Sequence, residues 1–214
     1  LPYWQRQFRR KKERLDRASW KKTLPNQAAR EAIKARIRRE GPLSTHAFDT
    51  KIVGEKKMWS RPPHKLALDY LWYTGELATS HRINFNKYYD LAERVFPAEL
   101  CALTLSDEAQ VDWLCQAALD RMGFGLASEV QHYWDAVSPT DLRQWRARSQ
   151  GLVQSVSIET ASGQWVQGIA PADIEARLAN LTPTTTRLRI LNPFDPAIRD
   201  RNRLQRLFGF EYRV

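Results

Sequence analysis

Cysteine and long apolar runs are both scarce in this chain. Two cysteines, Cys101 and Cys115, among 214 residues are too few for a disulfide scaffold, and we interpret both as free thiols in a reducing compartment. No apolar run is long enough to span a bilayer, and no signal-peptide pattern is present. We therefore expect neither a disulfide-rich secreted domain nor a membrane protein, but a cytoplasmic one.

Motifs for several kinds of chemistry are missing as well. The chain has no P-loop, nucleophile elbow or dinucleotide-binding fingerprint. Its four histidines, His46, His64, His81 and His132, lack metal-ligand spacing relative to one another or to the cysteines. Carboxylates are numerous but scattered. We expect a binding protein with no metal, no cofactor and no catalytic residue of its own, rather than a self-contained enzyme.

Positive charge is abundant but lies at one end of the chain. The formal net charge is +10, and residues 1–40 hold fourteen Lys and Arg against four Asp and Glu, whereas residues 41–214 hold twenty of each. A basic segment on a neutral body is typical of contact with a polyanion, and nucleic acid is the leading candidate. In residues 3–22 aromatic side chains are interleaved with the charges, and helical spacing is possible. The alternative for this stretch is a solvated helix face.

Residues 26–97 have the element order of a winged helix. Pro63 suits the first turn of a helix, and Gly75 suits the position just after its end. Caps, turn residues and apolar stripes together predict a helix from Asn26 to Gly41, a short helix over residues 43–49, a third helix from Pro63 to Gly75, and a hairpin of strands 77–82 and 87–91. In such modules the third helix usually enters the major groove, and the wing contacts the backbone or the minor groove.

A similar order recurs in residues 98–181. The predicted elements are helices over 106–122, 126–134 and 139–150, with Ser138 capping the last, and a hairpin of strands 152–159 and 164–169. Further along, the pattern predicts a helix over 171–180, a strand over 187–191, a final helix that Asp195 caps and Pro196 opens, and a last strand that begins at Phe210.

We therefore predict an α+β fold of tandem winged helix-turn-helix domains, mainly helical with short hairpins as wings. Its parts are a basic segment completing an upstream domain (1–25), a winged helix (26–97), a second winged helix (98–181) and the start of a truncated C-terminal α/β element (182–214).

Candidate DNA contacts lie in the basic segment, around the third helix and in the wing. They are Arg9, Arg10, Lys11, Lys12, Lys56, Lys57, Arg61, His64, Lys65, His81, Arg82 and Lys87. Beyond Lys65 the outward positions of the third helix include Asp69, Tyr70 and Tyr73, which pair poorly with guanine edges compared with arginine. We expect contacts to phosphate and to DNA shape, with little sequence preference; the alternative is plain surface charge.

Three runs of residues carry a family resemblance. They are GPLSTHAFD (41–49), the stretch from His64 to Pro97, which ends in YYDLAERVFP, and LNPFDPAIRDRNRLQRLFGFEYRV (191–214). The second contains the pattern YDL-x-x-R-V-x-P and the third PFDP followed by DR. With these runs the chain resembles the bacterial crosslink-repair DNA glycosylases of the YcaQ type, which are built from tandem winged helices.

Two departures from that family stand out. Arg199 occupies the position where members often carry a tryptophan before the DR pair. The family's catalytic Gln-x-Gln or Gln-x-Asp motif lies upstream of the matching runs, and no such motif stands in a corresponding place here. We therefore expect the chain to be a fragment that begins after the motif and is inactive by itself.

The resemblance implies a parent enzyme that hydrolyses the N-glycosidic bond of alkylated or crosslinked purines. This chain would supply surface that binds double-stranded DNA, as a monomer associated with the bacterial nucleoid. Two alternatives stay open: a transcription regulator with tandem winged helices, and a module whose winged helices only pack against each other. A regulator should prefer one DNA sequence strongly, and usually dimerises on a palindrome.

Overall fold

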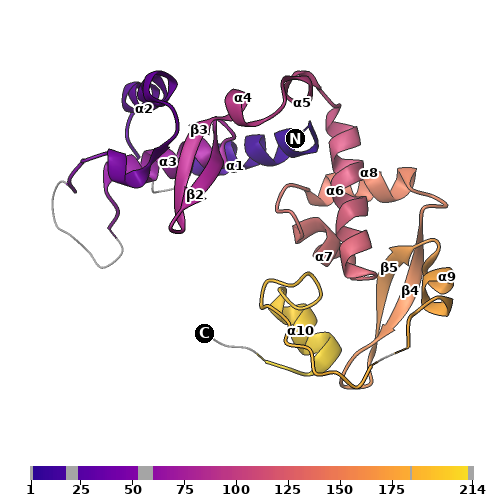
Figure 1. Ribbon diagram of the computed structural model, residues 1–214. Helices are drawn as coiled ribbons and strands as arrows, with labels where there is room; N and C mark the ends of the chain where they lie inside the picture. Colours follow the sequence, from indigo (N-terminus) through magenta and orange to yellow (C-terminus); the bar gives the residue numbers. More distant parts are fainter. Residues whose placement is uncertain (1, 18–23, 53–59, 184, 212–214) are drawn as a thin grey trace. The chain divides into compact units, whose positions relative to one another are not determined.

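The computed structural model describes residues 2–17, 24–52, 60–183 and 185–211 (Figure 1). Helices and two small antiparallel sheets make up these ranges, which agrees with the predicted α+β class. The chain divides into two compact units, residues 1–106 and 107–214. Two of the predicted DNA contacts, Lys56 and Lys57, lie outside the described residues.

The first unit contains a three-stranded sheet of order β1-β3-β2 and helices around it. Its elements are η1 (Pro2–Trp4), α1 (Gln5–Arg17), α2 (Gln27–Glu40), β1 (Leu43–Ser44), η3 (Thr45–Ala47), α3 (Pro63–Tyr73), β2 (Leu77–Ile83), β3 (Asn86–Leu91), α4 (Ala92–Val95) and α5 (Ala98–Ala102). Local signals place the main helices as predicted. Asn26 caps α2 by accepting a hydrogen bond from the Ala29 amide at 2.9 Å, and Pro63 opens α3.

The short helix predicted over residues 43–49 is wrong in its first part. Leu43 and Ser44 instead form strand β1, which pairs with Tyr89 and Tyr88 of β3, and a single 3-10 turn follows. Ser44 caps that turn, as its residue type suggested. The strand partner lies more than forty residues further along the chain, so no local pattern reports it.

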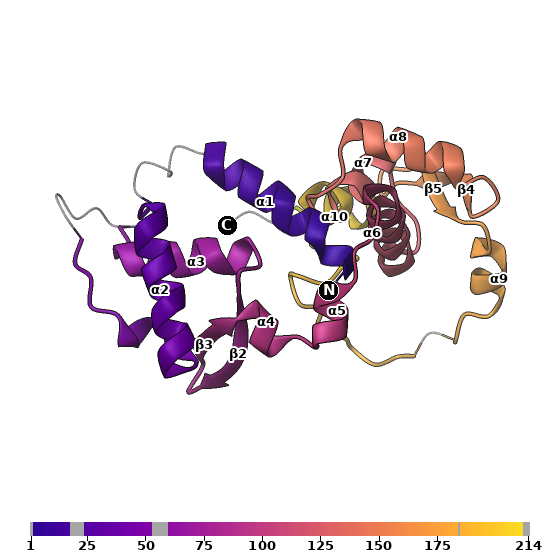
Figure 2. The same ribbon diagram turned by 90° about the horizontal axis from the view of Figure 1, so that it is seen from above.

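Helix α1 packs against α3 inside the first unit (Figure 2). Leu15 joins a core that includes Ile37 of α2 and Leu71 of α3. The Tyr70 hydroxyl donates to Asp16 at 2.9 Å, and the Arg30 guanidinium lies 4.5 Å from the Tyr70 ring centroid. Tyr70 is thus buried, which corrects its predicted outward position.

The close approach of α1 also depends on Gly75, at the end of α3. Its φ of +80° lies in the left-handed region that favours glycine. A Cβ built at this position would lie only 2.6 Å from the Phe8 ring of α1. Gly75 therefore ends α3 as predicted, and it also makes room for α1.

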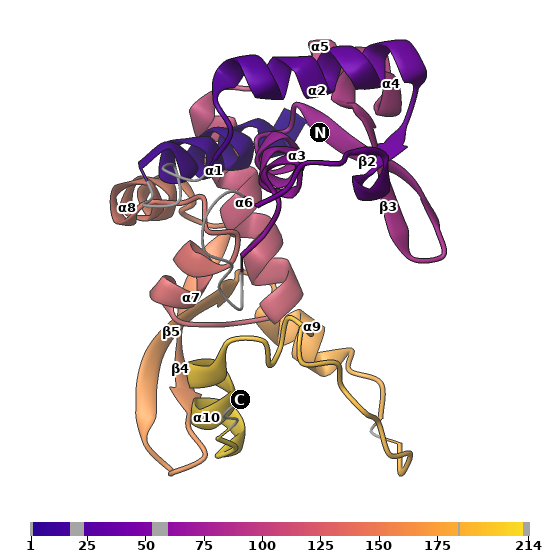
Figure 3. The ribbon, with the colours of Figure 1, turned by 90° about the vertical axis from the view of Figure 1, so that its left-hand side faces the viewer.

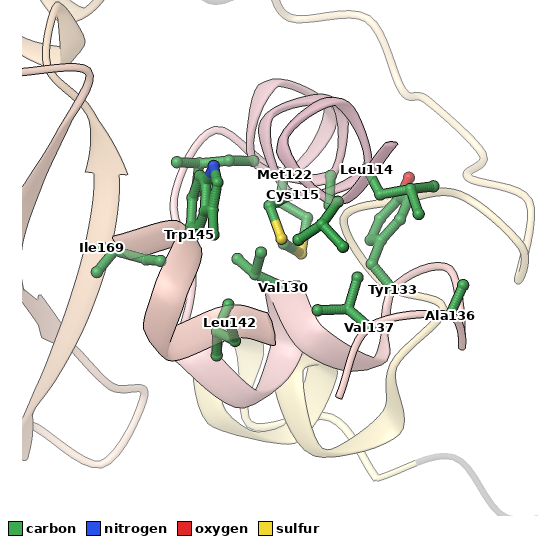
Figure 4. Packing of buried hydrophobic residues seen from close by; sticks show 13 residues of the cluster. Leu114, Cys115, Met122, Val130, Tyr133, Ala136, Val137, Leu142, Trp145 and Ile169 are labelled. Atoms are coloured by element: carbon green, nitrogen blue, oxygen red, sulfur yellow. The ribbon is translucent and has the colours of Figure 1, made fainter. Parts of the chain in front are cut away.

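The second unit contains α6 (Asp107–Met122), α7 (Ala127–His132), α8 (Pro139–Arg148), β4 (Val153–Glu159), β5 (Trp165–Pro171), α9 (Ile174–Ala179) and α10 (Arg201–Phe208). The elements up to α9 lie close to the predicted ranges. Ser138 caps α8 through its bond from the Asp141 amide, 3.1 Å long. Trp145 of α8, Leu114 of α6 and Val130 of α7 meet in the buried core (Figure 4).

The segment after α9 differs from its prediction in two ways. Residues 187–191 form no strand, and Leu188 and Ile190 are almost fully exposed, because the part of the chain that the structure describes offers them no sheet to pair with. The final helix begins at Arg201 and not at Pro196. Asp195 caps only a turn, accepting from the Ala197 amide at 2.9 Å, while Asp200 is the N-cap of α10.

Residues 210 and 211 are not in a strand either, and the rest of the last predicted strand lies outside the described residues.

Candidate nucleic-acid interface

The β2–β3 hairpin projects from the helices of the first unit (Figure 3). Its strands pair in register with Arg82 opposite Lys87 and Ile83 opposite Asn86. Asn84 and Phe85 form the two-residue turn with φ values of +46° and +65°. Positive φ at both central residues is the geometry of a type I′ turn, whose twist matches the twist of the two strands.

Three predicted contact residues come together on this hairpin. His81 and Arg82 are exposed, and the His81 ring stacks on Tyr88 with centroids 4.6 Å apart. The Lys87 ammonium lies 4.0 Å from the ring centroid of Trp72 in α3. The hairpin thus presents a small cationic surface of the kind that contacts phosphates.

The tip of the hairpin is apolar, which the sequence pattern alone did not indicate. Phe85 is 92% exposed, and Ile83 beside it is half exposed. The available signal was the turn itself: asparagine followed by a residue that must take positive φ, where glycine is the usual choice. A phenylalanine at that position stands out once the strand register is known.

Helix α1 carries seven basic and two acidic residues, but its charges are partly paired. Lys12 donates to Asp16 at 2.7 Å, and this bond raises the pKa of Lys12. Arg10 lies 3.7 Å from Glu13, and the Lys11 ammonium lies over the Tyr73 ring at 4.7 Å. Arg9 is exposed. The helix is therefore a basic surface with two carboxylates in it, packed against α3.

The described residues among the contacts predicted around α3 mostly interact with other residues of the first unit. Arg61 forms an ion pair with Asp69, and Lys65 is half-buried. His64 is only 6% exposed; its Nδ1 lies 2.7 Å from the Thr50 hydroxyl, and its ring stacks on Phe48. This burial leaves His64 no surface for DNA and gives it a role in packing instead.

The burial of His64 predicts a dependence of stability on pH. Burial, together with the charge of Lys65, lowers the pKa of His64 below its ordinary value, and Asp49 opposes this. The unfolded chain therefore takes up a proton near pH 6.5 that the native side chain takes up only at lower pH. Stability rises with pH through this window and falls as the pH drops below it.

We expect the urea midpoint of the protein to decrease when the pH is lowered from 7.5 to 5.5. His64→Gln should make this decrease smaller. Urea titrations at both pH values check the prediction. His132→Gln, at a position that is not buried, is the control and should leave the pH dependence as it is. An unchanged fall in His64→Gln would contradict the prediction.

Two triplets in the chain have the spacing of the family's catalytic motif. They are Gln5-Arg6-Gln7 in α1 and Gln110-Val111-Asp112 in α6. Gln5 donates to the Leu103 carbonyl at 2.8 Å, whereas Gln110 is fully buried and Asp112 pairs with Arg148 at 2.6 Å. Residues two apart on a helix do not face each other. Neither triplet therefore presents two side chains to one water molecule.

A buried charge cluster in the second unit is another feature that the sequence did not reveal. The Glu129 and Arg203 side chains are 5% and 3% exposed, with Arg203 Nη1 3.0 Å from Glu129 Oε2. Arg206 pairs with the other carboxylate oxygen. Arg203 also donates to the Phe124 and Met122 carbonyls at 2.9 and 3.1 Å. Because both of its oxygens are paired with arginines of α10, Glu129 holds α10 in place.

A cavity of about 290 Å³ lies beside this cluster, lined among others by His132, Tyr133, Phe194 and Arg199. The Arg199 guanidinium stacks over the Tyr133 ring at 3.8 Å and donates to the Tyr133 carbonyl. In the family-like segment around residues 193–201, Arg199 thus packs against the end of α7, while Asp195 caps a turn of the segment and Asp200 caps α10. The contacts of this segment account for a structural role.

Neither a metal-binding group nor a membrane-spanning helix is found in the described ranges. No group of three or more His, Cys, Asp or Glu in those ranges is placed to hold a metal ion. Their helices include none long and apolar enough to cross a membrane.

A projecting hairpin with cations on its flanks and an apolar tip is typical of proteins that bind duplex DNA. The chain belongs to the DNA glycosylase AlkZ-like family, whose model matches residues 1–214. This membership confirms the resemblance to crosslink-repair glycosylases and identifies DNA as the partner of the family. No solved structure matches the chain.

Proposed function

We propose that this chain is the duplex-binding part of a DNA repair glycosylase that excises alkylated or crosslinked purines by hydrolysis of the N-glycosidic bond. The β2–β3 hairpin carries the proposal: it brings His81, Arg82 and Lys87 together on a projecting element of a chain that belongs to a DNA glycosylase family. Four further predicted contacts, Arg9 to Lys12 of α1, form a second basic surface of the same unit.

We also propose that each unit contains a winged helix, within residues 26–97 and 98–181. In the first unit, α2, η3 and α3 are followed by the hairpin, and β1 adds a third strand. In the second, α6, α7 and α8 are followed by β4 and β5. Gly75 and Gly151, both with positive φ, follow the third helix in each case.

The same proposal gives the protein little sequence preference. In helix α3, the element that would read bases in a regulator, Tyr70 lies under α1 and Asp69 is paired with Arg61, which precedes the helix. Contacts from the hairpin and α1 then go to phosphates and to DNA shape, which carry little base information. One copy of the chain acting at the nucleoid suffices for this role, whereas a regulator on a palindrome needs two.

The catalytic step is the one that the resemblance to crosslink-repair glycosylases implies. An alkylated purine is already a good leaving group, so that a glutamine and a partner side chain need only position water at the anomeric carbon. We assign no such pair in this chain. In both glutamine triplets the two side chains lie on different sides of a helix, and Gln5 and Asp112 are bonded to Leu103 and Arg148. The part proposed for this chain is to hold the duplex.

The test is fluorescence anisotropy with two unrelated duplexes over a salt series from about 50 to about 200 mM. We expect the two dissociation constants to agree within about threefold and log K to fall steeply with log salt, because counterion release supplies the binding energy. A preference of about a thousandfold for one sequence would favour the regulator. No binding at the lowest salt would overturn the proposed function.

A further inference from the structure

Phe85 has no packing role among the described residues that would explain its identity. It occupies the second central position of the β2–β3 turn with φ of +65° and is 92% exposed. Glycine is favoured at such a position, because a Cβ crowds the backbone when φ is positive. The turn therefore carries a large aromatic side chain at a cost to its own stability, and that side chain buries almost nothing within the protein.

The residues around Phe85 indicate what it contacts. Arg82 and Lys87 face each other across the strands, one pair of residues back from the tip. Arg82 Nη1 also donates to the Phe85 carbonyl at 3.0 Å and so supports the turn that presents the ring. The stacked pair of His81 and Tyr88 follows one pair further back. The hairpin thus has an apolar tip with a cationic side chain on each strand behind it. This arrangement is complementary to a polyanion whose interior is apolar.

Duplex DNA has this combination, with phosphates along the groove edges and stacked bases between them. Proteins that bend DNA insert apolar side chains such as Phe, Leu or Ile between base pairs from the minor groove. That groove is only about 6 Å wide. A two-residue turn can place one ring there while the paired strands, which carry Arg82 and Lys87, remain outside beside the phosphates.

We propose that Phe85 is a wedge that enters the base stack of duplex DNA and opens one base step, with Ile83 widening the apolar tip and Arg82 and Lys87 holding the flanking phosphates. The inference rests on the proposed function, because it requires that the chain binds duplex DNA. An anionic lipid surface would attract the same cations. Membership of a DNA glycosylase family favours the duplex.

The test uses a duplex that contains 2-aminopurine, whose fluorescence rises when it is unstacked. We compare the wild type with Phe85→Gly and Asn84→Gly. Phe85→Gly creates an Asn-Gly pair, the most favourable sequence for this turn, so the hairpin is retained while the ring is removed. Asn84→Gly replaces the other central residue of the turn by glycine and keeps the ring, and it is the matched control.

For the wild type and the control we expect a rise in 2-aminopurine fluorescence on binding. For Phe85→Gly we expect most of this rise to disappear and the affinity to fall about tenfold. The salt slope should stay the same, because every phosphate-binding side chain is still present.

Each of the other results overturns the wedge. If Phe85→Gly keeps both the fluorescence rise and the affinity, or if the wild type binds without unstacking, the wedge is wrong while the proposed function stands. If the wild type binds no duplex, both fail. A parallel titration with anionic vesicles identifies the other source: vesicle binding that disappears in Phe85→Gly, with DNA binding unaffected, would assign the tip to a lipid surface.

Discussion

Replacing Glu129 by alanine is expected to destabilise the second unit by about 3–5 kcal/mol, because it leaves two arginines without their carboxylate. Arg203 is buried at 3% exposure and loses the partner that lies 3.0 Å away, while Arg206 loses the other oxygen. An unpaired buried charge costs more than the pair contributed, so the single replacement is the damaging one. Urea unfolding followed by circular dichroism measures the change, and hydrogen exchange of the α6 and α8 amides assigns it to this unit.

Two further variants separate the effect of burial from the effect of charge. Arg177→Ala removes an exposed pair with Asp173 and Asp120, and it should cost less than about 1 kcal/mol. A triple variant with Glu129→Leu, Arg203→Met and Arg206→Met removes the whole cluster at similar volume and should cost less than Glu129→Ala alone. If Glu129→Ala is as mild as Arg177→Ala, the cluster does not hold α10 to α7.

Replacing Arg9, Arg10, Lys11 and Lys12 together by alanine is expected to weaken binding to all duplexes alike. The slope of log K against log salt should become shallower by up to about four units, roughly one for each phosphate that the protein no longer neutralises. The structure adds a second effect. Removing Arg10 and Lys12 leaves Glu13 and Asp16 without these cations, and the carboxylates then repel the phosphates. Affinity should therefore fall further than the change in slope alone implies.

A salt series with two duplexes measures both quantities. The control is the double variant Arg187→Ala with Arg189→Ala, which removes charge from an exposed stretch of the second unit. Its slope should stay within about one unit of the wild type, because the proposed phosphate contacts lie in α1 and the hairpin and not in this stretch. An unchanged slope in the quadruple variant would make α1 a solvated helix face, and the hairpin would then be the remaining candidate.

Much of the fold was predictable from local signals. Asn26, Pro63 and Ser138 begin helices where expected, and Gly75 follows the end of α3. Caps and first-turn prolines act over three or four residues, so they work almost independently of the rest of the chain. The hairpin over residues 77–91 follows from turn residues between two short strand candidates for the same reason. The basic character of residues 1–40 can be read directly from the sequence.

The candidate site was predictable only in part. His81, Arg82 and Lys87 do lie together on the hairpin, because a short turn brings them together locally. His64 was wrong as a surface contact, since its burial depends on Thr50 and Phe48, which precede it by more than a dozen residues. Phe85 needed the strand register before its position in the turn and its exposure became apparent.

Local residues dictated most of the helices, the two hairpins and the basic segment. Packing between distant parts of the chain decided which of these elements contact each other. Tyr70 points inward because α1, more than fifty residues earlier, covers it, and Arg203 is buried because Glu129, 74 residues earlier, neutralises it. The alternating residues 187–191 form no strand, because alternation predicts a strand only where a neighbouring strand supplies hydrogen bonds and a core covers one face. A chain can specify its own turns and caps, but a partner strand or a counter-ion must be brought to it by the fold.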